Sequence, residues 1–247
     1  MRLLRRVLET AIIAAVLLTA WQLLHLYAGD TALPAPLATL AYLSRFALTQ
    51  RFLDNALATL IVFAYALALS YLIGLALGIW LGAHHLSGAV GEPILVSLYT
   101  LPKITLYPVV LLIFGLAMSG RVTFGAMHGV LPVALLTMNA IRNIRPVYLK
   151  AARTLHLSLP QTIGSVLIPA TLPEVVAGLR IGFTLTLLGV LLAEMFAAKE
   201  GLGFLIVNAM QLVQNEEMIA VAVVLFVFAT VANAILLAVE HHWFRRV

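Results

Sequence analysis

Cysteine and charge are what this sequence has least of. Cysteine is absent, which excludes a disulfide framework, a thiolate nucleophile and a cysteine-ligated metal site. Only 10% of the 247 residues are charged, against roughly 25% in a soluble domain. By contrast, 63% of the residues are hydrophobic and the mean hydropathy is +1.06. Water cannot be the main solvent of such a chain, so the sequence predicts an integral membrane protein.

Motifs for catalysis are also missing. The sequence contains no H-E-x-x-H zinc motif, no glycine-rich phosphate loop ending in Gly-Lys and no G-x-S-x-G elbow. His84 and His85 are adjacent, so they do not share a helix face as two metal ligands at i and i+4 would. The basic residues flank apolar runs and form no patch with interleaved aromatics, which argues against nucleic-acid binding. We expect no enzymatic activity, metal site or cofactor in this chain.

Six apolar runs are long enough to cross the hydrocarbon core, which takes about 20 helical residues at 1.5 Å rise each. The first run follows three arginines and exceeds the hydrophobic region of a signal peptide, which favours a retained helix over a cleaved one. The runs predict an all-α membrane protein with a single transmembrane domain over residues 1–247. The expected spans lie at about 7–28, 57–83, 94–118, 122–141, 174–197 and 217–240.

Basic residues are distributed unequally between the two sides of the predicted spans. With the N-terminus inside, ten Lys and Arg residues fall on the cytoplasmic side and four fall outside. We therefore expect both termini and the connection 142–173 to be cytoplasmic. The stretch from Leu33 to about Asp54 is expected to form an outer surface helix packed on the bundle. After the fifth span, residues 199–214 predict a turn and a short helix that closes the outer mouth.

Small residues recur every four positions in the second predicted span. They place little bulk along one helix face, so another helix can approach closely. A contact within the chain is the favoured interpretation, and a dimer seam is the alternative. The residues are Ala66, Ser70, Gly74, Gly78 and Gly82.

The connection 142–173 is rich in helix signals. Pro146 can occupy the first turn of a short helix. Ser158 and Gln161 have the spacing of a capping box, which predicts a second short helix that runs to Ile168.

Pro169 is expected to end that second helix. Thr171 and Glu174 repeat the capping-box spacing, which predicts the start of the fifth span. A loop that only joined two spans could be a few residues long. The residues leave two interpretations open: a rigid basic element that docks into another protein, or an interfacial element held by anionic lipid head groups.

A resemblance to a known family favours docking. The segment Lys-Ala-Ala-Arg-Thr-Leu-His-Leu-Ser at 150–158, with Leu-Ile-Pro-Ala-Thr-Leu-Pro at 167–173, resembles the EAA loop of binding-protein-dependent ABC importer permeases. The segments 101–108 and 193–203 are similar to the branch that imports nitrate, sulfonates, taurine and bicarbonate. Two positions depart from the motif: Lys150 replaces its Glu and His156 replaces its Gly, where a left-handed turn is costly for a residue with a Cβ.

The resemblance implies a type I importer permease fold in the bacterial cytoplasmic membrane. It implies partners as well: two copies of an ATP-binding subunit that carry ATP and Mg, a second permease copy, and a periplasmic or surface substrate-binding protein. Ala151 and Ala152 are expected to face the ATP-binding subunit. The expected docking residues are Lys150, Ala151, Ala152, Arg153, Thr154, Leu155, His156, Leu157 and Ser158.

Polar residues inside the third to fifth spans are candidates for the translocation path. An ionisable residue at membrane depth usually faces a cavity or a partner, which makes Lys103 the most informative of them. It can attract an anionic solute, or it can pair with a carboxylate or with helix carbonyls. A secondary carrier would need membrane-buried acids, for which Glu194 alone is thin support. The path candidates are Thr100, Lys103, Thr105, Asn139, Thr184 and Glu194.

Overall fold

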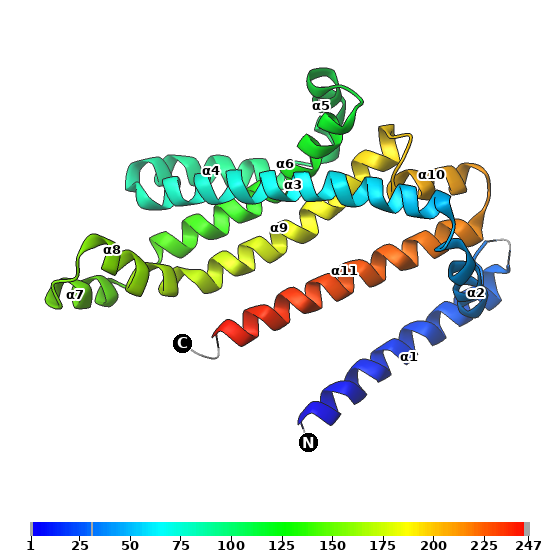
Figure 1. Cartoon of the computed structure of the whole chain (residues 1–247), viewed down its shortest axis with the longest axis horizontal. Helices are drawn as coiled ribbons and strands as arrows, with labels where there is room; N and C mark the ends of the chain where they lie inside the picture. The colour runs from blue at the N-terminus through cyan, green and yellow to red at the C-terminus, as the bar shows by residue number, and fades with distance from the viewer. Residues whose placement is uncertain (1, 31, 245–247) are drawn as a thin grey trace.

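The regular structure is helical throughout residues 2–30 and 32–244, the part of the chain that the computed structural model describes. The elements follow one another along the chain with short connections (Figure 1). They are α1 (Arg2–Ala28), α2 (Pro36–Phe46), α3 (Gln50–Ala83), α4 (His85–Thr100), the 3₁₀ turn η1 (Lys103–Leu106), α5 (Tyr107–Phe114), α6 (Met118–Arg142), α7 (Pro146–Thr154), α8 (Leu159–Thr162), the π turn η2 (Ile163–Leu167), α9 (Ile168–Ala197), α10 (Leu202–Gln211) and α11 (Asn215–Phe244).

The helix lengths confirm the predicted all-α fold with six spans. Five helices among the described residues are long and apolar enough to cross a membrane, and a bent helix pair makes a sixth if the pair counts as one span. The second span is longer than predicted and begins at Gln50, because the Thr49 hydroxyl caps α3 by accepting the Phe52 N–H at 3.3 Å. The surface helix α2 is correspondingly shorter than the stretch to Asp54.

The third span is broken, which corrects the expectation of one continuous helix over 94–118. The two halves, α4 and the η1–α5 segment, meet at an angle of 89°. Leu101 is extended, with φ −62° and ψ 136°, because the ring of Pro102 disfavours a helical conformation for the residue before it. The break therefore places Pro102 and Lys103 at the bend.

The loop after α6 also differs from the prediction. The helix α7 begins with Pro146 as expected, and Gln161 Oε1 accepts the Ser158 N–H at 2.9 Å, as in a capping box. The predicted stop at Pro169 is wrong, because α8 continues through η2 into α9. Thr171 does not begin a helix. Its hydroxyl donates back to the Leu167 carbonyl at 2.9 Å, as Thr does inside a helix.

Three long helices, α3, α6 and α9, form the packed core, with α6 the most enclosed of them. The small residues of α3 lie against α6, which confirms the interpretation as a contact within the chain. A Cβ on Gly78 would lie 2.6 Å from Thr137 Cβ. Ser70 Oγ and Thr186 Oγ1 lie 2.9 Å apart, which adds a polar contact between α3 and α9. The core is thus held by close backbone approach.

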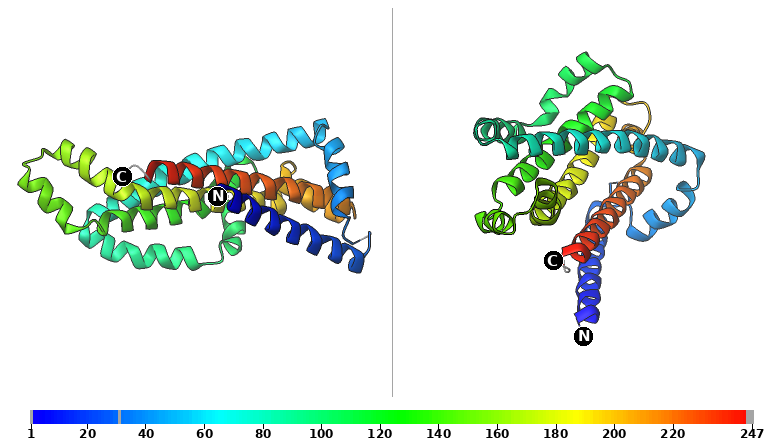
Figure 2. Two further views of the ribbon diagram at one scale, coloured as in Figure 1. Left: turned by 90° about the horizontal axis from the view of Figure 1, so that it is seen from below. Right: turned by 60° about the vertical axis from the view of Figure 1, so that its left-hand side comes forward.

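The helices α1 and α11 lie outside this core. α1 contacts mainly α2, and Trp21 Nε1 donates to the carbonyl of Pro34, in the connection before α2, at 3.1 Å. The N-terminal end of α1 and the C-terminal end of α11 point toward the end of the molecule that carries α7 and α8, while α2 and α10 lie at the opposite end (Figures 1 and 2). The predicted topology requires this arrangement, in which the termini and the connection 142–173 share one side.

Candidate translocation path and docking loop

The candidate docking loop comprises α7, the turn Leu155–Ser158 and α8. Most of the expected docking residues are exposed, and Leu157 is partly buried. Ala152 is only 3% exposed, and α7 packs against the π turn η2. The expectation that Ala152 faces a partner is therefore wrong, because its methyl group belongs to the interior of the loop. Ala151, beside it, is exposed.

His156 adopts a left-handed conformation with φ 50°. The His156 N–H donates to the Arg153 carbonyl and the Leu157 N–H to the Ala152 carbonyl, both at 3.0 Å. These two bonds form a Schellman motif, in which His156 takes the C′ position that usually belongs to glycine. The turn thus has the geometry for which the family motif carries Gly, and here the backbone strain of a residue with a Cβ accompanies it.

A cavity of about 590 Å³ lies between this loop and the start of α9. Arg145, Tyr148 and Ala151 line it from the loop side, and Pro173 and Glu174 line it from α9. Arg145 is exposed at this rim, as are Lys150 and Arg153 on α7. The loop therefore presents a basic, rigid and partly hollow surface at one end of the bundle.

The bend in the third span brings three path candidates together. Lys103 Nζ donates to the Tyr99 carbonyl at 3.0 Å and lies 5.0 Å from the centre of the Tyr99 ring. Thr100 Oγ1 donates to the Ser97 carbonyl and Thr105 Oγ1 to the Pro102 carbonyl. In the described part of the chain, no carboxylate lies within ion-pair distance of Lys103, and Glu194 is not its partner.

The other path candidates lie elsewhere in the chain. Asn139 lines a polar cavity of about 680 Å³, together with Arg142 and Glu92, which form an ion pair. Thr184 is exposed on α9, with its hydroxyl 3.3 Å from the Arg180 carbonyl. Glu194 is 1% exposed at the far end of α9. A single chain therefore does not gather the six candidates into one site.

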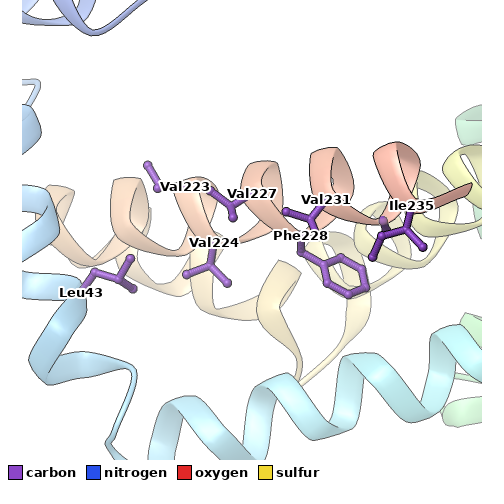
Figure 3. Close-up of a pocket in the computed structure, with 8 residues that line it drawn as sticks. Leu43, Val223, Val224, Val227, Phe228, Val231 and Ile235 are labelled. Atoms are coloured by element: carbon purple, nitrogen blue, oxygen red, sulfur yellow. The ribbon is translucent and has the colours of Figure 1, made fainter. Parts of the chain in front are cut away.

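A groove of about 430 Å³ along α11 is lined only by apolar side chains (Figure 3). Leu43 of α2 closes one end, and Val227, Phe228 and Val231 lie along α11. A charged solute would lose its hydration there without gaining a polar partner. This groove is therefore a poor candidate for the path.

Sequence reasoning missed a polar cluster around residues 200–203. It counted Arg121 only as an outer charge, yet Arg121 is 7% exposed and forms an ion pair with Glu200 at 2.8 Å. Asn55 and Thr59 were not singled out, although they lie four residues apart on the outer end of α3. That i, i+4 spacing of polar residues in an apolar helix was the available signal.

The structure thus combines a bundle of long apolar helices with a broken span and a basic loop at one end. The family model described as "Binding-protein-dependent transport system inner membrane component" matches residues 71–247, and the chain belongs to this family. The family assignment confirms the predicted permease subunit of an ATP-driven importer and does not favour an ion-gradient carrier.

Individual relatives agree with this assignment. The chain is 29% identical to the taurine transport system permease protein TauC of Escherichia coli, over 87% of this chain and 81% of the relative. It is also 29% identical to the nitrate import permease protein NrtB of Synechococcus elongatus, over 78% of this chain and 73% of the relative. The fold is similar to that in a crystal structure of an amino acid ABC transporter with histidines, with a TM-score of 0.62 and 18% identity over 83% of this chain and 98% of the other.

Proposed function

We propose that this permease moves a small anionic solute into the cell, and that the bend at Lys103 borders the path. The observation that carries the proposal is the exposure of this bend. Backbone without helical hydrogen bonding is tolerated at membrane depth only where protein covers it or where it lines a water-filled cavity. Pro102 and Thr105 are exposed in a single chain, and Lys103 is partly exposed. The bend therefore needs either a second subunit or an aqueous path beside it.

A second copy of this chain, placed against the bend, would cover part of it and would enclose an aqueous path between the two copies. The two bends would then face a shared cavity, and each would contribute a cation to it. An unpaired ammonium group at membrane depth is costly, and a transient anionic solute would offset that cost. Taurine and nitrate, the solutes named for the relatives, each carry an anionic group. Selectivity among such anions would come largely from a separate substrate-binding protein outside the membrane.

The energy for transport would come from an ATP-binding subunit that holds ATP and Mg and docks, one copy per permease, on residues Lys150–Ser158. The exposed cations Lys150 and Arg153 would meet acidic or polar groups at the rim of this interface, while Ala151 permits close approach. Closure of the two ATP-binding subunits would rock the docked loops and give alternating access. Both termini and this loop would lie in the cytoplasm, with the chain in the bacterial inner membrane.

The test is uptake into proteoliposomes that contain this chain with the ATP-binding subunit and binding protein encoded beside it. Taurine, nitrate and an alkanesulfonate are the probes. We expect ATP-dependent uptake of at least one probe, a loss of at least tenfold in Lys103→Met, and retention of most activity in Lys103→Arg. Folded yield, measured by size-exclusion chromatography, should be equal in the two variants. Unchanged uptake in Lys103→Met would contradict the role of this charge.

A further inference from the structure

The segment Glu200–Gly203 is attached to all three core helices through side chains. Its four consecutive residues each have one partner, drawn from α3, α6 or α9. Glu200 Oε1 accepts from Arg121 Nη2 at 2.8 Å, Gly201 N donates to Asn55 Oδ1 at 2.7 Å, Leu202 N donates to Thr59 Oγ1 at 2.7 Å, and Gly203 N donates to Glu194 Oε2 at 3.0 Å.

Three of these contacts together cap the helix α10. The first N–H groups of a helix lack partners within it, and a side chain just before the helix usually accepts from them. Gly201, at the N-cap position of α10, has no side chain to do so. The cap is supplied instead by Asn55 and Thr59 of α3 and by Glu194 of α9. A carboxylate is also the favourable charge at a helix N-terminus.

The glycines of this segment are required by the close approach of Glu194. Gly201 has φ 112°, and a Cβ there would lie 2.3 Å from the Glu194 carboxyl carbon. A Cβ on Gly203 would lie 2.5 Å from the Leu191 carbonyl oxygen. A side chain on Gly201 would push the carboxyl group away from the start of α10, and a side chain on Gly203 would push α10 away from α9.

Thr59 connects Glu194 of α9 to the first residue of α10. Its hydroxyl donates to Glu194 Oε2 at 2.9 Å while it accepts from Leu202 N. Thr59 is 3% exposed and Glu194 is 1% exposed, so water cannot replace a lost bond without local opening. Removal of the hydroxyl would leave a buried N–H without an acceptor and a buried carboxylate with one donor fewer.

The helix α10 joins the core to the outer layer of the protein. Leu202 and Leu205 of α10 pack in one cluster with Phe52 of α3 and with Val221 and Leu225 of α11. A displacement of α3 or α9 would therefore be transmitted through α10 to α11 and, through the same cluster, to α2.

We propose that Asn55, Thr59 and Glu194 form an outer latch. These positioning residues fix α10 over the outer mouth and make it move with α3 and α9 during transport. The part of this inference that concerns movement rests on the proposed importer function. The part that concerns the position of α10 does not.

The absence of cysteine allows a direct test with one introduced probe. Ala209 of α10 is fully buried, so a thiol in Ala209→Cys reports local opening of this helix. The complete transporter, with its ATP-binding subunits, is placed in lipid nanodiscs, where both faces are accessible, and the rate of maleimide labelling is measured without ATP. Leu205→Cys, also fully buried, serves as a second probe.

The isosteric variant Thr59→Val removes the hydroxyl, while Thr59→Ser keeps it. We expect Thr59→Val to raise the labelling rate about tenfold, the factor that corresponds to 1.4 kcal/mol, and Thr59→Ser to label at nearly the rate of the parent. Asn55→Ala should also raise the rate. Glu216→Gln, which removes an exposed charge near α10 without touching the latch, should not.

Equal rates in Thr59→Val and Thr59→Ser would overturn the latch, as would an equal rise in Glu216→Gln. A second measurement addresses movement. The number of solute molecules taken up per ATP hydrolysed should fall in Thr59→Val and recover in Thr59→Ser, and no difference between these two would overturn the role in transport. Failure of the parent protein to take up any anion would count against the proposed function and leave the labelling comparison intact.

Discussion

The strained turn at His156 allows a quantitative test of the docking-loop geometry. A residue with a Cβ in the left-handed conformation costs roughly 1–2 kcal/mol, and His156 is held there with φ 50°. His156→Gly would remove that strain. Glycine also loses roughly 0.5–1 kcal/mol more backbone entropy when it becomes ordered. The difference predicts a net gain of about 0.5–1 kcal/mol in the stability of the turn.

Hydrogen exchange measures this gain at the two amides that close the turn. Peptides covering His156 and Leu157 should exchange about two- to fivefold more slowly in His156→Gly, since a tenfold change corresponds to about 1.4 kcal/mol. His156→Ala is the matched control, because it removes the imidazole and keeps the strain, so its exchange rate should match that of the parent. Equal rates in the Gly and Ala variants would refute the assignment of strain to this residue.

Two further predictions concern packing and charge. Gly78→Ala would place a Cβ 2.6 Å from Thr137 Cβ, so overpacking should destabilise the protein by about 1–3 kcal/mol and lower its unfolding midpoint in detergent, whereas Gly164→Ala, with open space around it, should not. Burial, and after it the charge of Glu217, raises the pKa of Tyr42 above its ordinary 10.0, so Glu217→Gln should lower that pKa in a tyrosine NMR titration. An unchanged pKa would show that the carboxylate does not act on the phenol.

Hydropathy sufficed to predict the long apolar helices, because the length of an apolar run is a direct consequence of membrane thickness. It could not locate the break at Pro102, since an apolar run has the same hydropathy whether its backbone is straight or bent. The proline was visible, but its effect depends on whether neighbouring elements tolerate a bend. The same limit explains the error at Thr171, where capping-box spacing also occurs within a continuous helix whose Thr donates to its own preceding carbonyl.

The candidate sites were predictable to different degrees. The helices of the candidate docking loop follow from local signals, namely Pro146 and the Ser158 cap, whereas its docking role rests on the resemblance of the motif and stays a prediction. Glu194 attracted attention as a buried acid, but its partners are the Thr59 hydroxyl, which lies far away in the sequence, and the backbone N–H of Gly203, and neither pairing can be seen in the sequence. Ala152 was assigned to an interface because it is small. The structure shows that small side chains also serve the loop's own packing.

The most direct test of the account is whether the exposed face of α7 couples this chain to an ATP-binding subunit. Ala151→Asp would insert an unpaired charge into the proposed interface, at a cost of several kcal/mol if the site is fully desolvated, while it leaves the buried Ala152 in place. We expect normal folded yield, with co-purification of the ATP-binding subunit and solute-stimulated ATP hydrolysis both lost. A variant that still binds the subunit and couples ATP hydrolysis to uptake as the parent does would contradict the assignment of this loop as the docking site.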